Sequence, residues 1–271
     1  EKLNMLIIIS DDYGLDSSID EAILKAAEAG VINSTSVLIN CINNDDIIDC
    51  LKRSNLNVGL HANLTTGTSL HKSHEKKTLT NYSNNFFKLP IFLLKYFSFL
   101  VKHQEIYDEF ESQILKLKSK GIKISHIDSH QHIHLLPGIW RIINLLALKH
   151  QIPRVRVSLE RVRLKDPLIL ILKKIIFTIL SIFNKEYDKI HYFKFYGLSM
   201  QNQKNYSANL KKILNEYEIN TVDTEIMVHL SIDDDIMHNE KIKHGRQREL
   251  DVFLDPKIKK LLNKIRLNER F

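Results

Sequence analysis

Short apolar runs alternate with amphipathic stretches along this chain, beginning at its amino terminus. The run MLIIIS at 5–10 predicts a buried parallel strand that ends at two aspartates. Apolar residues at helical spacing then predict a helix in SSIDEAILKAAEAG at 17–30, capped by one of its first two serines and ended by its glycine. A strand at 31–40, a helix at 45–54 and a strand at 56–64 follow. Strands that alternate with helices predict a parallel sheet or barrel.

The second half of the chain repeats this alternation after a polar, turn-rich segment from Thr65 to about Leu89, which we interpret as an insertion or lid. The predicted elements are a helix at 106–121, a strand at 123–130, a helix at 138–150, a strand at 153–160, a strand at 221–231 and a closing helix at 246–265. A length of 271 residues is compatible with one domain over 1–271, with insertions near 65–103 and 164–196.

Two further segments are apolar and basic together, at 86–103 and 166–185. The second is interrupted by Lys173 and Lys174, so it lacks the roughly 20 apolar residues that span a bilayer. One interpretation is a pair of helices packed on the core or at a subunit interface. The other is an interfacial surface that meets a lipid-linked substrate or contacts a membrane peripherally.

Composition narrows the class of partner. The formal charge is +7, but the basic residues are scattered, which favours a modestly basic surface over a nucleic-acid groove. Cys41 and Cys50 are too few and too widely spaced for a metal knuckle, so we expect free thiols in a cytoplasmic protein. The amino-terminal apolar run is shorter than that of a signal peptide.

The stretch SHIDSHQHIH at 125–134 places four histidines and one aspartate in ten positions. In an extended strand, His126, Asp128, His130, His132 and His134 would share one face. Residues two apart on a strand lie roughly 6 to 7 Å apart, so one metal ion would use one or two of them. The other ligands must then come from elsewhere in the chain.

Metal-compatible side chains also stand at the ends of other predicted strands, where parallel α/β barrels collect their functional groups. These are Asp11 and Asp12 after the first strand, His61 at the end of the third, and His229 at the end of a late strand. Each alone has a simpler explanation, such as a helix cap or a hydrogen-bonded core histidine. Their coincidence at successive strand ends indicates a site.

Four blocks in this order resemble the YdjC/ChbG carbohydrate deacetylases, a group that includes the hopanoid-associated HpnK proteins. The blocks are the segment from SDDYG to VLIN, VGLHANLTTG, HIDSHQHIHLLPGI, and EIMVHLS with a later REL. The resemblance implies a distorted (β/α) barrel of mostly parallel strands. It also implies a metal-dependent hydrolase that removes the acetyl group from an N-acetylated saccharide or a lipid-linked sugar.

Carried over by motif, the resemblance implies metal ligation by Asp12, His61 and His130, with Asp11 as the general base. His229 is a weaker transfer, and the proton donor to the departing amine would be His229, His132 or His134. One carboxylate and two imidazoles suit one divalent ion, for which we expect Mg²⁺ or Zn²⁺ ahead of Co²⁺ and Mn²⁺.

Neighbouring polar residues have supporting or simpler roles. Asp128 either fixes the tautomer of a ligand histidine or orients local backbone. Arg154 and Arg156 alternate in PRVRV and either bind substrate or form surface ion pairs. His126 lies deeper in the strand and is interpreted as structural.

Two other functions stay open on sequence alone. One is a metal hydrolase of the same fold that cuts another amide or an ester. The other is a catalytically silent protein that binds metal or polyanions, for which the basic balance is the only support. A homodimer is also compatible with the sequence.

Overall fold

Six parallel strands form the central sheet in a computed structural model that describes residues 5–71, 78–163, 166–182, 193–198, 200, 205–220, 222–233 and 245–268. The strand order is β4-β3-β2-β1-β6-β5, and every neighbouring pair is parallel. The strands are β1 (Leu6–Tyr13), β2 (Ser34–Val37), β3 (Asn57–Ala62), β4 (Ile127–Ser129), β5 (Lys194–Tyr196) and β6 (Thr224–Val228). This confirms the predicted α/β class with parallel strands.

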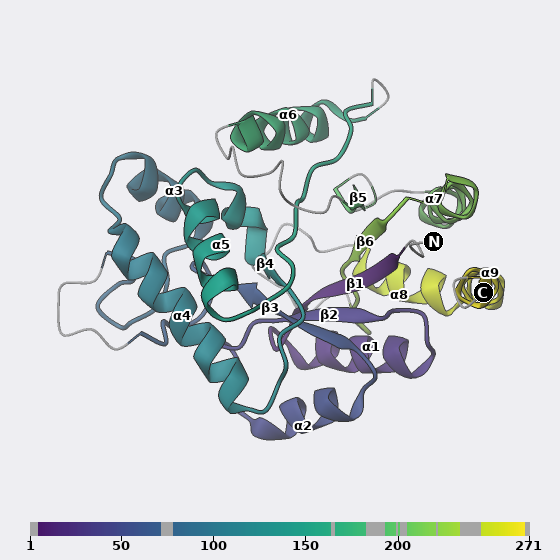
Figure 1. The fold of residues 1–271 in the computed structure, drawn as a ribbon, viewed down its shortest axis with the longest axis horizontal. Coiled ribbons are helices and arrows are strands. Elements are labelled where there is room, and N and C mark those ends of the chain that lie inside the picture. The colour runs from purple at the N-terminus through teal and green to yellow at the C-terminus, as the bar shows by residue number, and fades with distance from the viewer. Residues whose placement is uncertain are drawn as a thin grey trace.

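Helices follow most strands, and several of them pack along the outer side of the sheet (Figure 1). Figure 1 shows α1 (Ser17–Glu28) and α2 (Asp45–Arg53) on one side of the sheet and α6 (Leu168–Ile182) on the other. The helices are α1 (Ser17–Glu28), α2 (Asp45–Arg53), α3 (Leu89–Phe97), α4 (His103–Ser119), the 3-10 helix η1 (His130–Leu135), α5 (Ile139–Lys149), α6 (Leu168–Ile182), α7 (Tyr206–Asn220), α8 (Arg246–Leu254) and α9 (Pro256–Asn268).

Side chains of β1 alternate between two hydrophobic environments, because successive residues of a strand point to opposite faces. Leu6 and Ile8 belong to the large core that the sheet shares with the outer helices. Ile7 and Ile9 face inward, in a smaller cluster with residues of β5 and β6, and Phe177 of α6 packs against both clusters. Because this inner cluster is small, the inner face has room for polar groups further along the strands.

The sheet curls into a half-barrel, and its open side is crossed by ion pairs rather than by strand pairing in the described residues. The strand predicted at 153–160 is reduced to a single parallel bridge between Ile127 and Val155, so that prediction was wrong. Its partner β4 has only three residues, and Pro153 has no backbone N–H to donate. Instead, Arg154 and Arg156 beside β4 reach across to Glu225 on β6.

Other element boundaries differ from the prediction for local reasons. β1 continues through both aspartates to Tyr13 rather than ending before them. The cap of α1 is Asp16, whose side chain accepts a hydrogen bond from the N–H of Ser18 at 2.9 Å, and not a serine. The single closing helix is two helices, because Pro256 begins α9 directly after α8 has ended.

The two apolar-basic segments form α3 and α6, and both helices expose large apolar side chains. Among the described residues, no helix combines the length and the apolar character that crossing a bilayer requires. Cys41 and Cys50 are free thiols, as expected. The exposed apolar residues of these helices include Ile91, Leu94 and Phe97 on α3 and Leu168, Ile169, Leu172, Ile175, Ile176 and Ile179 on α6.

Candidate metal and catalytic site

A backbone irregularity near the end of β1 brings two adjacent aspartates into one site. The pairing of β1 with β2 shifts register between Ser10 and Tyr13, and Asp12 adopts a φ of 74°. Adjacent residues on a regular strand point to opposite faces, but this β-bulge re-aims one of them. Asp11 and Asp12 are therefore both buried and both line the same cavity.

Asp12 faces two imidazoles from different elements. Its Oδ1 lies 3.3 Å from Nε2 of His61 on β3 and 3.0 Å from Nδ1 of His130, the first residue of η1. One ligand-type atom from each of these three residues lies within 4.8 Å of the others, and all three residues are buried. We call Asp12, His61 and His130 the ligand group.

The ligand group fits a divalent cation by its donor set. One carboxylate and two imidazoles are the protein ligands of a catalytic metal site that keeps positions open. A second set of Asp11, His61 and Asp128 meets the same distance criterion, but it shares only His61 with the first. Asp128 is better placed as a support, because its Oδ1 lies 2.7 Å from Nδ1 of His61 and leaves Nε2 to face Asp12.

An arginine network holds the carboxylates around the ligand group. Arg156 is 1% exposed, and its guanidinium contacts Asp11 at 2.7 and 2.8 Å, Asp128 at 2.7 Å and Glu225 at 2.5 Å. Arg154 also pairs with Glu225. This placement supports a positioning role for Arg156 rather than a surface ion pair. Burial alone would raise the pKa of Asp11, but Arg156, His61 and His229 together outweigh burial and lower it, so Asp11 is ionised at neutral pH.

Arg246 at the start of α8 is a site residue that sequence reasoning missed. It is 4% exposed, lines the cavity, and places its Nη2 2.7 Å from Oδ2 of Asp12. This contact occupies one oxygen of Asp12 and leaves Oδ1 to the imidazoles. Burial favours a neutral Asp12, yet Arg246 and the two histidines lower its pKa well below the ordinary value. The only sequence signal was its position two residues before the REL motif.

Negative charge is in excess at this site. The four carboxylates of Asp11, Asp12, Asp128 and Glu225 face the three guanidiniums of Arg154, Arg156 and Arg246. Burial alone would lower the pKa of His61, but Asp128 and Asp11 reverse this effect and raise it to about 10. A protonated His61 supplies the missing positive charge, and a bound cation would supply it instead.

The remaining histidines of SHIDSHQHIH diverge after β4. Positive φ angles at Gln131 and His132 turn the chain into η1, so the strand predicted at 123–130 is shortened to β4, and the shared face expected through His134 was wrong. His132 lines the cavity and contacts the ring of Phe177, with ring centroids 5.4 Å apart. Burial lowers its pKa well below the ordinary value.

His134 and His126 do not line the cavity. His134 is fully buried, and its Nδ1 lies 2.6 Å from Oγ of Ser129, so it is not placed to donate a proton to a substrate in the cavity. The ring of His126 fills the space above Gly59, where an added Cβ would lie 2.2 Å from its Nε2. Gly59 is therefore required to admit this ring.

His229 follows β6 and lines the cavity, 9% exposed. Its backbone N–H donates to Oε2 of Glu249 at 2.9 Å, which ties it to α8. Burial and then the charge of Arg246 lower the pKa of His229 to about 4, so its side chain is neutral at pH 7. A group with so low a pKa is a strong acid once it has gained a proton.

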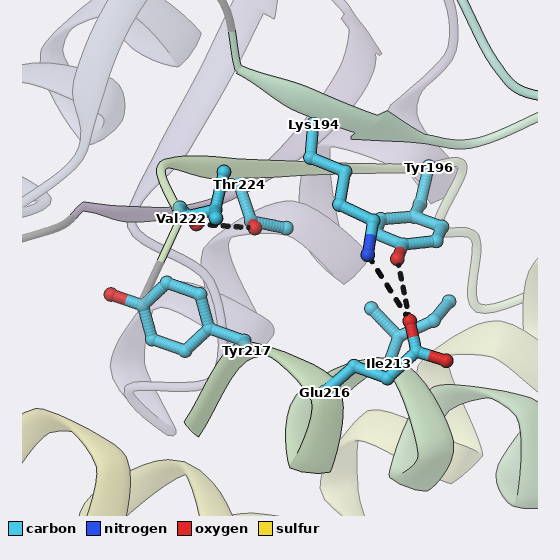
Figure 2. Close-up of a pocket in the computed structure, with 7 residues that line it drawn as sticks. All are labelled: Lys194, Tyr196, Ile213, Glu216, Tyr217, Val222 and Thr224. Carbon is cyan, nitrogen blue, oxygen red and sulfur yellow. Dashed lines mark hydrogen bonds and ion pairs between the residues drawn. The ribbon is translucent and has the colours of Figure 1, made fainter. Parts of the chain in front are cut away.

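A second hollow, between β5 and α7, differs sharply from this cavity. Figure 2 shows its lining, in which Lys194 and Tyr196 both bond to Glu216. Its volume is about 10 Å³, which is room for about one water molecule. The cavity at the strand ends measures about 480 Å³, within the range of ligand sites.

Comparisons with known proteins identify relatives of this chain. The model of the YdjC-like protein family matches residues 5–264. Two relatives are named carbohydrate deacetylase. The one from Clostridium beijerinckii is 32% identical to this chain over 151 residues, and the one from Oceanobacillus iheyensis is 26% identical over 251 residues. The first alignment covers 55% of this chain and 58% of the relative, and the second covers 90% and 94%. The chain thus aligns with little more than half the length of several relatives.

A solved structure shares the fold. The crystal structure of an Enterococcus faecalis protein, described as a candidate cellobiose-phosphate cleavage protein, superposes with a TM-score of 0.75. The superposition covers 97% of this chain and 95% of that one, at 20% sequence identity. The likeness extends over nearly the whole chain and concerns the arrangement of the elements.

Proposed function

The chain belongs to the YdjC-like protein family, and from that premise we propose that it is a metal-dependent carbohydrate N-deacetylase. The ligand group, buried beside Asp11 at the carboxyl ends of the strands, is the observation that carries this proposal. Relatives named carbohydrate deacetylase support the choice of an N-acetylated sugar as substrate.

Hydrolysis of an acetamide needs a proton acceptor and a proton donor. Water adds to the carbonyl carbon and gives up a proton, the C–N bond breaks, and the nitrogen leaves as an amine with a proton gained. A divalent ion held by Asp12, His61 and His130 would lower the pKa of water and polarise the carbonyl. Zn²⁺ and Mg²⁺ both suit this donor set, with Co²⁺ and Mn²⁺ as alternatives.

Asp11 is the proposed acceptor of the water's proton. It lies beside the ligand group, lines the cavity, and is kept ionised by Arg156. Both oxygens of Asp11 accept hydrogen bonds from Arg156, so the carboxylate is fixed in direction before substrate arrives.

His229 is the proposed proton donor to the departing amine. It faces the same cavity from β6, on the other side of β1 from His61. His229 is neutral at pH 7 in the resting site, so the proton that it donates must be one gained during the reaction. Arg246 beside Asp12 is positioned to hold an oxygen of the substrate, since among the described residues its Nε and Nη1 have no hydrogen-bond partner.

The test combines metal content with acetate release. Purified protein should contain about one divalent ion per chain and release acetate from diacetylchitobiose, and a chelator should abolish the activity until metal is restored. Asp12→Ala and His130→Ala should lose both metal and activity. Asp11→Asn should keep the metal and lose activity, because Asp11 is outside the ligand group.

His150→Gln is the matched control, because His150 pairs with Glu111 and is outside the cavity lining. It should retain metal and activity. Acetate release that survives chelation and the Asp12→Ala change would refute the mechanism. Cleavage of other amides or esters from a test panel, in place of the acetylated sugar, would indicate a different hydrolase on the same fold.

A further inference from the structure

The cavity has two halves of opposite character. Its polar half includes the ligand group with Asp11, His229 and Arg246, together with Ser129, Gln131 and His132. Its other side is formed by α3 and α6, which derive from the two apolar-basic segments. We call these residues the apolar wall: Leu89, Leu93, Phe97, Ile176, Phe177 and Leu180.

An extended oligosaccharide is poorly matched to the apolar wall. Each sugar ring carries several hydroxyl groups, and a hydroxyl taken from water without a new partner costs free energy. None of the six side chains of the apolar wall can donate or accept a hydrogen bond. Hydrocarbon loses no hydrogen bonds on entering such a site, and its burial removes apolar surface from water on both sides.

The apolar wall continues to the molecular surface on the same two helices. Phe97 of α3 is 58% exposed and Ile176 of α6 is 53% exposed, although both line the cavity. A chain that starts beside the ligand group therefore has an apolar path outward. Lys173 is the one cationic side chain that α6 adds to the described lining.

We propose that the substrate is an amino sugar that carries an apolar chain, and that the apolar wall holds this chain while the ligand group holds the amide. This rests on the proposed function, because the amide is placed by the metal site. The chain can be attached at the anomeric oxygen of an N-acetylated sugar, or it can be the N-acyl group itself. Both sources present the same hydrocarbon to the cavity.

The experiment compares three substrates with the metal-loaded protein. They are N-acetylglucosamine, its octyl glycoside, and N-octanoylglucosamine, each used below its critical micelle concentration. The released carboxylic acid is measured, and binding is measured by calorimetry at two temperatures. We expect kcat/KM for one octyl-bearing substrate to exceed that for N-acetylglucosamine by about tenfold or more, with a negative heat-capacity change on binding. A preference for the octyl glycoside would indicate a chain at the anomeric oxygen, and a preference for N-octanoylglucosamine would indicate a chain as the N-acyl group.

Paired variants separate the apolar wall from its surroundings. Leu93→Asn and Ile176→Asn place an amide in the wall, whereas Leu94→Asn and Ile175→Asn change adjacent residues that do not line the cavity. Ile176 is 53% exposed, so its substitution leaves the core intact. The wall variants should lose about tenfold in kcat/KM and in affinity for the octyl substrate, and the neighbouring variants less than about twofold.

Each outcome bears on one of the two proposals. Equal kcat/KM and equal affinity for all three substrates would overturn the apolar-chain proposal, and so would equal losses in Leu93→Asn and Leu94→Asn. Octyl-dependent binding that Leu93→Asn weakens, without acid released from any substrate, would support the apolar wall and refute the deacetylase. Acetate release with no preference for the octyl-bearing substrates would support the deacetylase and refute the apolar-chain proposal.

Discussion

The polar half of the cavity and the apolar wall differ in how their side chains are held. Asp11, Asp12 and His61 come from strands, are at most 2% exposed, and are fixed by ion pairs. Phe97 and Ile176 come from helices at the periphery and are 58% and 53% exposed. One half is built into the sheet, and the other lies on α3 and α6, which are outside the sheet (Figure 1).

This difference assigns separate tasks to the two halves. Catalytic groups must be held in fixed geometry, which buried strand ends with charged partners provide. The choice of substrate can vary with peripheral segments while the scaffold stays the same. Substitutions in the polar half should therefore affect folding, metal binding and turnover, whereas substitutions in the apolar wall should affect only the choice of substrate.

The largest effect should follow the loss of Arg156. Arg156→Met leaves three carboxylates, from Asp11, Asp128 and Glu225, without their shared guanidinium. Removing one partner of a buried pair costs about 3 to 5 kcal/mol, so the free energy of unfolding should fall by that amount in chemical denaturation. Adding Glu225→Gln should recover part of the loss. A single variant as stable as the parent would show that the network does not hold the polar half.

Asp11→Asn should separate catalysis from metal binding. A general base contributes roughly 10² to 10⁴ in rate, so kcat should fall by that factor while metal content stays the same. Metal content by elemental analysis and acetate release on one sample provide the check. The exposed Asp49→Asn is the control and should change neither. Loss of metal in Asp11→Asn would place Asp11 among the ligands instead.

Metal affinity should depend on pH through His61. Its pKa in the metal-free fold is raised from about 6.5 to about 10, so at pH 8 a metal ion must displace a proton from it. The apparent affinity should therefore rise with pH through the neutral range, with release of about one proton per ion. Calorimetry in buffers of different ionisation enthalpy measures this number. Leu93→Asn should leave the number of protons released unchanged, because the apolar wall carries no titrating group near His61.

The same shift affects the stability of the metal-free protein. Because the folded pKa of His61 lies above the unfolded value, its contribution is fully present below about pH 6.5 and is lost as pH rises to about 10. Denaturation of metal-free protein across this range should show falling stability. Bound metal should reduce the dependence, since it replaces the proton.

The smallest effect should follow substitution of Arg246 by lysine. Arg246→Lys keeps a positive charge near Asp12 but replaces the several nitrogens of the guanidinium group, which lines the cavity, by a single one. We expect KM to rise by about tenfold, equivalent to one hydrogen bond to a charged group, with kcat and metal content little changed. Equal losses in kcat and metal would assign Arg246 to holding Asp12 rather than substrate.

Much of the fold followed from local patterns. The continuous apolar run MLIIIS predicted β1, the alternation of strand-like and helical segments predicted β2, β3 and β6, and helical spacing predicted α1, α2, α4 and α5. The prediction of β1 succeeded because burial on both faces of a parallel strand favours an unbroken apolar run. The prediction of a strand at 153–160 failed because the alternating pattern of the segment indicates only which side chains point inward. It does not report whether a neighbouring strand is long enough to pair with them.

The candidate site was only partly accessible to the sequence. The motifs named Asp12, His61 and His130, and the structure brings all three within reach of one another. The bulge at Asp12 that lets two adjacent aspartates share a site could not be read from residue types, since aspartate is also common in turns and helix caps. Arg246 and Glu225 were missed because each acts on residues more than 60 positions away.

What the sequence determined by itself was which groups could do chemistry and which segments would be strands or helices, because both depend on residue type and short-range spacing. Tertiary structure alone decided that Arg156 would sit among three carboxylates and that His134 would be buried beside Ser129. It also decided that α3 and α6 would meet around one cavity. These outcomes depend on how the sheet curls, and curling is a property of the packed strands rather than of any one segment.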